Sequence, residues 1–151
     1  MPTIINVKEL DGGIDRGIAY IHSKWGNETN YSFYEDAITN SSLPGKKLPK
    51  FFLMINDGII IGCCGLITND FISRHDFYPW LACLFIEENQ RKKGYAGLLM
   101  NAIESVAQTD GFETLYLTTQ LDGYYEKYDW VRMEDGITFD GTPARIYRKA
   151  L

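Results

Sequence analysis

The middle of the chain reads Trp80-Leu81-Ala82-Cys83-Leu84-Phe85-Ile86, followed by Glu87-Glu88-Asn89-Gln90-Arg91-Lys92-Lys93-Gly94-Tyr95-Ala96-Gly97. The near-continuous apolar run is typical of a central strand that is buried on both faces. Apolar residues then recur at positions i, i+3, i+4, i+7, i+8 and i+11, which predicts an amphipathic helix that ends at Asp110-Gly111. These positions are Tyr95, Leu98, Leu99, Ala102, Ile103 and Val106. The stretch therefore predicts a buried strand, a basic loop and a helix.

The basic loop has features of a site for anionic groups. The first backbone N–H groups of a helix have no partner within it, and the helix dipole adds about half a positive charge there. Gly94 permits close approach to the backbone, small Ala96 does nearly the same, and Arg91-Lys92-Lys93 adds the positive charge that a diphosphate requires. The alternative is a solvated basic face with a turn glycine, and composition alone divides the two readings evenly. Neither G-x-x-x-x-G-K-[ST] nor G-x-G-x-x-G is present.

The flanking sequence predicts a single domain over residues 1–151 with an α/β (α+β) fold. Ile14, Ile18, Ile21 and Trp25 recur at helical spacing before Gly26-Asn27, and a second helix is expected from Tyr31 to about Thr39. Strands are expected at 3–7, 51–55, 59–67, 80–86 and 114–119, helical turns at 123–128, and a closing hairpin at 130–139 and 142–148. This order predicts a mixed sheet with helices on its faces.

Charge and hydropathy exclude several classes of protein. The chain carries 15 Lys and Arg against 20 Asp and Glu, and this net charge of −5 repels nucleic acid and attracts cationic substrates. Its apolar runs are shorter than the roughly 20 residues of a membrane span, and no leader peptide is recognisable. We therefore expect a cytoplasmic protein without nucleic-acid or membrane partners. The 2 His and 3 Cys show no zinc-ligand spacing, so we expect no metal site and buried, reduced thiols.

Two elements of the sequence resemble a known family. Arg91-Lys92-Lys93-Gly94-Tyr95-Ala96 resembles the R/Q-x-x-G-x-G/A signature of the GNAT acetyltransferases, between an apolar strand and an amphipathic helix as in that family. Gly123-Tyr124-Tyr125-Glu126-Lys127-Tyr128-Asp129-Trp130 resembles the family's F-Y-E-K-x-G-F element. Asp129 replaces the family's glycine, and because Asp tolerates the left-handed conformation, we expect the turn to be kept. The order of strands matches the family along nearly the whole chain, and the resemblance implies a mixed, mostly antiparallel central sheet of about seven strands with helices on both faces.

The resemblance implies acetyl-coenzyme A as co-substrate and no metal. The backbone of Leu84, Phe85 and Ile86 would pair with the pantetheine arm, in a gap where the strand from Thr114 splays away. A backbone N–H near Leu84 or Phe85 would polarise the acetyl carbonyl, and amides of the basic loop would hold the diphosphate. The cofactor-binding residues implied are Leu84, Phe85, Ile86, Arg91, Lys92, Lys93, Gly94, Tyr95, Ala96, Gly97, Thr119 and Tyr125.

The resemblance also indicates catalytic residues. Tyr125 matches the tyrosine that is the family's usual proton donor to the leaving thiolate, and its alternative role is packing. Because a tyrosine pKa lies above a thiol pKa, we expect Tyr125 to act mainly as a hydrogen-bond donor to sulfur. An amine acceptor also needs a base. Asp76, in the loop that enters the buried strand, is the candidate, whereas Glu87 is expected to be a solvated charge.

The function expected is transfer of an acetyl group from acetyl-CoA to a primary amine of a small molecule by direct attack. Two alternatives stay open: acetylation of protein or peptide amines, which shares every cofactor residue, and a catalytically silent CoA-binding regulatory module. The acceptor groove is expected between the N-terminal helices, the loop 69–79 and the closing hairpin, and no motif there names the acceptor. The resemblance also allows a homodimer formed through sheet edges.

Overall fold

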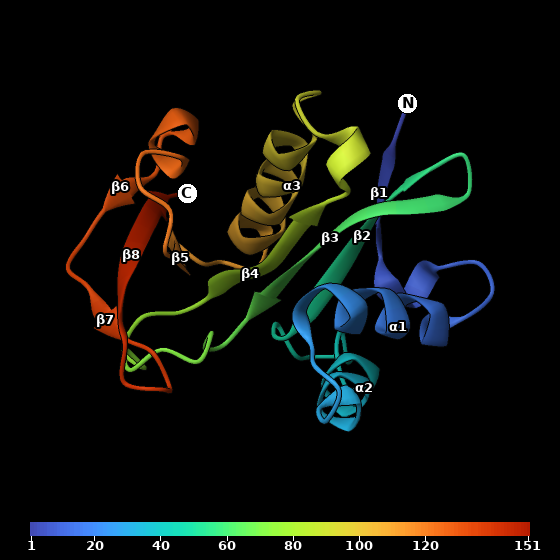
Figure 1. Ribbon diagram of the computed structural model, residues 1–151, viewed down its shortest axis with the longest axis horizontal. Coiled ribbons are helices and arrows are strands. Elements are labelled where there is room, and N and C mark those ends of the chain that lie inside the picture. The colour runs from blue at the N-terminus through green and yellow to red at the C-terminus, as the bar shows by residue number, and fades with distance from the viewer.

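A mixed β-sheet with helices on both faces makes up the computed structural model, which describes residues 1–151 (Figure 1). The helices are α1 (Ile14–Trp25), α2 (Tyr31–Thr39) and α3 (Tyr95–Thr109), with 3-10 turns η1 (Val7–Glu9), η2 (Glu88–Gln90) and η3 (Tyr125–Tyr128). The strands are β1 (Thr3–Asn6), β2 (Lys50–Asn56), β3 (Ile59–Ile67), β4 (Trp80–Ile86), β5 (Thr114–Thr119), β6 (Val131–Arg132), β7 (Gly136–Ile137) and β8 (Pro143–Ala150).

The strand order confirms the predicted fold class. The order is β1-β2-β3-β4-β5-β8-β6, with β7 also on β8, and every pair is antiparallel except β4–β5. The sheet has eight strands instead of about seven because residues 130–139 form two short strands in place of one. The chain leaves the sheet between them, where Asp135 pairs with Arg132 at 3.0 Å and Glu134 pairs with Arg74 at 3.7 Å.

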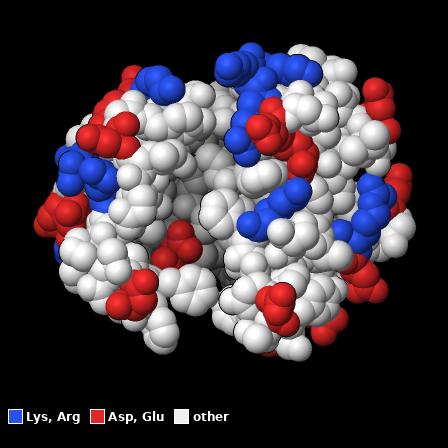
Figure 2. All heavy atoms as spheres, viewed as in Figure 1, with Lys and Arg blue, Asp and Glu red and all other residues white.

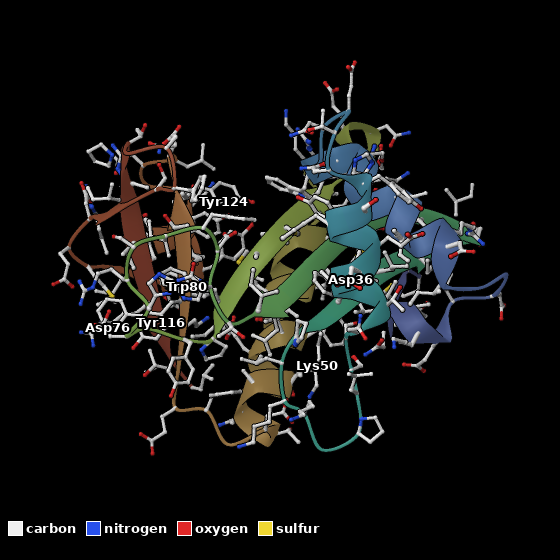
Figure 3. All side chains as sticks on the ribbon, turned by 90° about the horizontal axis from the view of Figure 1, so that it is seen from below. Asp36, Lys50, Asp76, Trp80, Tyr116 and Tyr124 are labelled. Carbon is white, nitrogen blue, oxygen red and sulfur yellow. The ribbon has the colours of Figure 1, made fainter.

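Each face of the sheet has its own apolar core. Helices α1 and α2 pack on one face with Ile18, Ile21 and Ile38, and α3 packs on the opposite face with Leu99 and Ile103 (Figures 1 and 3). The predicted helix periodicities are confirmed at these fully buried residues, but Trp25 and Leu98, which are expected on the same apolar faces, are 46% and 42% exposed. None of the helices combines the length and hydropathy that a membrane span needs.

Strands β4 and β5 diverge after a single contact. Trp80 pairs with Tyr116, whose N–H also donates to the carbonyl of Pro79 at 3.1 Å, and no further β4–β5 pair follows. Beyond this point β5 pairs only with β8, so the second half of β4 has no strand on that edge. The predicted burial on both faces holds for residues 80–82 and 86, but 83–85 are only partly buried because they face this gap. The predicted splay of the two strands is confirmed.

Candidate active site

The gap opens at a bulge in β4. Cys63 pairs with Phe85 whereas Gly65 pairs with Ala82, so β4 contains one more residue than the facing segment of β3. Cys83 occupies the bulge with a left-handed φ of 55°, and the Cys63 thiol donates to its carbonyl at 3.3 Å. Burial raises the pKa of Cys63 well above its ordinary value, so this thiol keeps the proton that it donates. The bulge re-aims the backbone of β4 where its open edge begins.

The loop after β4 presents unpaired N–H groups. Lys92 and Gly94 both adopt left-handed conformations, with φ of 63° and 79°. Gly94 is the N-cap of α3, and no side chain caps the helix. The N–H of Leu98 donates to the Gly94 carbonyl at 3.2 Å, so the N–H groups of the first turn precede the intrahelical bonds. A Cβ on Gly94 would meet nothing within 4 Å, which leaves open space in front of this positive helix end.

Arg91 fixes the loop to the end of the strand. Its Nε donates to the carbonyl of Ile86 at 2.9 Å, and its guanidinium lies 5.4 Å from the ring centre of Phe85. The side chain therefore lies along the open edge of β4, although the residue remains exposed to solvent. This contact argues against the reading of the basic stretch as a purely solvated face.

A pocket of about 500 Å³ lies between the second half of β4, this loop, the first turn of α3 and the segment around η3. It is lined by Leu84, Phe85, Ile86, Gln90, Arg91, Lys92, Gly94, Tyr95, Ala96, Leu121, Tyr124, Tyr125, Lys127 and Tyr128. Figure 2 shows the molecule hollowed between its two halves, with basic side chains along the upper rim. The pocket thus gathers most of the residues that the sequence implicates in cofactor binding.

Three of those residues do not line the pocket. Lys93 donates from Nζ to the Gln90 side chain at 3.1 Å. Gly97 lies under Tyr128, where a Cβ would approach the ring to 3.2 Å. Thr119 ends β5 and accepts the N–H of Leu121 through its hydroxyl at 3.0 Å. The structure gives Gly97 and Thr119 roles in shaping the pocket wall.

Asp76 does not lie in the pocket either. Its carboxylate accepts two hydrogen bonds from Arg74, at 2.9 and 2.6 Å, and its side chain is 59% exposed. The hydrogen bonds from Arg74 lower the pKa of Asp76, which makes it a weaker base. Figure 3 shows Asp76 beside Tyr116 and Trp80 and apart from Tyr124, which lines the pocket. The structure therefore gives no support to Asp76 as the base.

Tyr125 lies in the pocket wall at the start of η3. Its ring contacts those of Tyr124, Tyr147 and Trp130, at centroid distances of 4.9, 5.9 and 6.3 Å. Burial, followed by the neighbouring tyrosines, raises the pKa of Tyr125 to about 12. Asp129 ends η3 in the left-handed conformation with φ of 68°, so the expected turn is kept. This turn aims the tyrosine-rich segment at the gap.

Sequence reasoning missed two charged contributors. Lys127 lines the pocket and lies 4.6 Å from the ring centre of Tyr124, which adds positive charge opposite the basic loop. Glu87 is not a solvated charge: its Oε2 accepts the Tyr20 hydroxyl at 2.5 Å and the Lys24 ammonium at 2.8 Å. Burial alone would raise the pKa of Glu87, but these two hydrogen bonds lower it. Glu87 thereby ties the end of β4 to α1.

Solved structures share this fold over the whole chain. A GNAT family acetyltransferase from Elizabethkingia anophelis, solved with acetyl-CoA bound, superposes with a TM-score of 0.70, at 15% identity over 99% of this chain and 98% of that one. An aminoglycoside 6'-N-acetyltransferase complexed with coenzyme A gives 0.72, at 15% identity over 98% and 96%. A GNAT family acetyltransferase from Streptococcus pneumoniae gives 0.71, at 15% identity over 100% of both chains.

The sequence itself matches one family model. Comparison with curated protein sequences gives no significant match. No group of three or more His, Cys, Asp or Glu side chains is placed to hold a metal ion. The model of the acetyltransferase (GNAT) family matches residues 17–130, a range that contains β2 to β5, the bulge, the basic loop and η3. The chain therefore belongs to the GNAT acetyltransferase family.

Proposed function

We propose that this protein transfers an acetyl group from acetyl-CoA to a primary amine of a small molecule by direct attack. The observation that carries the proposal is one continuous pocket, which joins the open edge of β4 to the uncapped, basic N-terminus of α3. The first feature suits an extended arm with amide groups, and the second suits a diphosphate. Bound acetyl-CoA and coenzyme A in proteins of the same fold support this reading.

The residues of the pocket fit coenzyme A. Leu84, Phe85 and Ile86 offer backbone hydrogen-bonding groups on an edge that no strand covers. The N–H groups after Gly94 point to open space, and Arg91 and Lys92 add positive charge beside it. When bound, the cofactor supplies the acetyl group as an activated thioester. The bulge at Cys83 sets the backbone N–H groups that follow it as hydrogen-bond donors to the acyl oxygen.

Tyr125 acts as a hydrogen-bond donor to the leaving sulfur. With its pKa raised to about 12, the hydroxyl lies about 3.5 units above a thiol with a pKa near 8.5, so complete proton transfer costs about 5 kcal/mol. A shared hydrogen bond avoids that cost and still stabilises the negative charge that develops on sulfur. The raised pKa also keeps Tyr125 protonated, and hence able to donate, at every physiological pH.

A small-molecule acceptor is the class that we propose. Two proteins of the same fold are described as aminoglycoside acetyltransferases, which act on amines of small molecules. The acidic net charge of −5 favours cationic acceptors, although it does not choose among them.

The test combines calorimetric titration of the protein with acetyl-CoA and a thiol-release assay over a panel of primary amines and peptides. Binding together with thiol release for a small amine supports the proposal. Release with peptides alone would replace it with a peptide acetyltransferase, and binding without release for any acceptor would favour a regulatory module. Absence of binding at millimolar acetyl-CoA would refute the assignment of the pocket.

A further inference from the structure

A partly buried acidic side chain in the loop after β3 has neither a hydrogen-bond partner nor an ion-pair partner. Asp70 follows β3 in the loop that leads to β4, and its carboxylate takes part in no ion pair and no hydrogen bond. The other acids discussed above are engaged: Glu87 by Tyr20 and Lys24, and Asp76 by Arg74. A partly buried carboxylate without a hydrogen-bond or ion-pair partner destabilises the folded protein, which indicates a functional role for Asp70.

The loop holds Asp70 in a fixed place. Asn69 forms two hydrogen bonds with the backbone of Ile72, at 2.9 and 3.1 Å, and these span Asp70. Phe71 has a left-handed φ of 54°, and its carbonyl accepts the N–H of Phe139 at 3.0 Å. On the other side the Phe71 ring lies 5.7 Å from Phe33 of α2. The loop therefore bridges the β7–β8 hairpin and α2, the elements that flank the gap.

Asp70 lies in the loop that packs between α2 and the β7–β8 hairpin. The charge of its carboxylate contributes to raising the pKa of Cys83 on β4 and of Tyr34 on α2. Burial raises the pKa of Cys83 and of Tyr34 to about 12 and that of Cys63 behind them well above its ordinary value, so all three are neutral at physiological pH.

We infer that Asp70 receives the acceptor amine: its carboxylate binds the substrate ammonium and takes one proton from it beside the β4 bulge. This inference rests on the proposed function. It differs from the expectation for Asp76, because Asp70 is partly buried and unpartnered whereas Asp76 lies exposed in an ion pair with Arg74.

The proton step balances as R–NH3⁺ plus Asp70–COO⁻ giving R–NH2 plus Asp70–COOH. The amine nitrogen gains a free lone pair, which is what attack on an acyl carbon requires, and the carboxyl later releases its proton to water. Burial raises the pKa of Asp70 to about 6, about two units above an ordinary aspartate, so the transfer from an amine is easier by about 100-fold.

The surroundings of Asp70 also indicate the class of amine. Phe33 precedes Tyr34 in the sequence and Phe71 follows Asp70. The two phenylalanine side chains are 52% and 55% exposed, and their rings contact each other. A single carboxylate flanked by exposed aromatic rings suits one ammonium group on an apolar or aromatic body, and a polycation would need further acids. We therefore expect an arylalkyl monoamine such as 2-phenylethylamine to be a better acceptor than spermidine.

The experiment compares the protein with the Asp70→Asn and Asp36→Asn variants, using acetyl-CoA and 2-phenylethylamine in the thiol-release assay. Asp36 is a matched control because it lies exposed on α2 and contacts only Asn40. We expect kcat/KM to fall at least about 100-fold in Asp70→Asn and to stay unchanged in Asp36→Asn, with equal acetyl-CoA affinity in all three. Calorimetry should show that Asp70→Asn alone loses affinity for the amine.

A pH profile of the unmodified protein provides a second readout that needs no variant. The logarithm of kcat/KM should bend near pH 6, where Asp70 loses its proton, because the groups around it stay neutral and Arg74 is engaged by Asp76 and Glu134. Equal rates in Asp70→Asn, or no bend between pH 5 and 7, would overturn the role of Asp70. Failure of every protein to bind acetyl-CoA would instead overturn the proposed function, so the two failures are distinguishable.

Discussion

Replacing Asp70 with Asn should stabilise the protein at neutral pH. The folded-state pKa of about 6 lies above the ordinary aspartate value of 3.8, so the folded state binds the proton more tightly than the unfolded chain does. By linkage, the free energy of unfolding falls as pH rises from about 4 to about 6, and the loss is complete above that window. A difference of 2.2 units corresponds to at most about 3 kcal/mol. Because the carboxylate is only partly buried, we expect about half of this, roughly 1.5 kcal/mol.

Urea unfolding at pH 4 and at pH 7.5 measures this difference. At pH 7.5 the midpoint of Asp70→Asn should lie about 0.5–1.5 M urea above that of the unmodified protein, and at pH 4 the two should nearly coincide. The Asp36→Asn variant should show no such pH-dependent gap, because that carboxylate is exposed and loses little contact with water on folding. A variant that is less stable by the same amount at both pH values would refute the reasoning, since it would mean that Asp70 makes a stabilising contact in the folded state.

Three further substitutions test the pocket. Gly94→Glu should abolish acetyl-CoA binding in calorimetry because it places a negative charge in the diphosphate site, whereas Gly141→Glu, at another open glycine with positive φ, should leave binding unchanged. Tyr125→Phe should preserve acetyl-CoA affinity and lower kcat about 10-fold or more, as thiol release will show; unchanged turnover would reduce Tyr125 to a packing role. Gly62→Ala should destabilise the fold by about 1–3 kcal/mol in urea unfolding, because its Cβ would approach the Phe85 carbonyl to 2.8 Å, and wild-type stability would contradict that packing.

Most of the fold could be predicted because its signals are local. The periodicity of Ile18 and Ile21 and the Gly26 stop defined α1, and the apolar run before the basic loop defined β4. The closing hairpin was harder, because residues 130–139 alternate too weakly to show where the chain leaves the sheet. The chain leaves the sheet where Glu134 pairs with Arg74 and Asp135 pairs with Arg132. Arg74 is far from Glu134 in the sequence, so local patterns do not reveal this pair.

The site divides in the same way. The basic loop could be predicted since its chemistry lies in consecutive residues, and the open edge of β4 followed from the family resemblance. Asp70 could not, because Asn69-Asp70 reads as an ordinary polar loop. What distinguishes this carboxylate is its partial burial without a partner, in a loop that packs on α2 through Phe71 and Phe33. Asp76, in the same loop, is the acid predicted as the base, but its carboxylate forms an ion pair with Arg74, two residues away.

Asp70 and Tyr125 together define the pH range in which the proposed reaction can proceed. Burial is the main cause of both shifts, which place the carboxyl pKa near 6 and the phenol pKa near 12. Between these values Asp70 is ionised and able to take a proton, while Tyr125 is protonated and able to donate a hydrogen bond. Two groups separated in this way can serve opposite roles at one pH. The burial of Asp70 brings its proton affinity closer to that of the amine. The unpartnered carboxylate would then lower the stability of the free protein, and the same carboxylate would accept the proton in the complex with the acceptor.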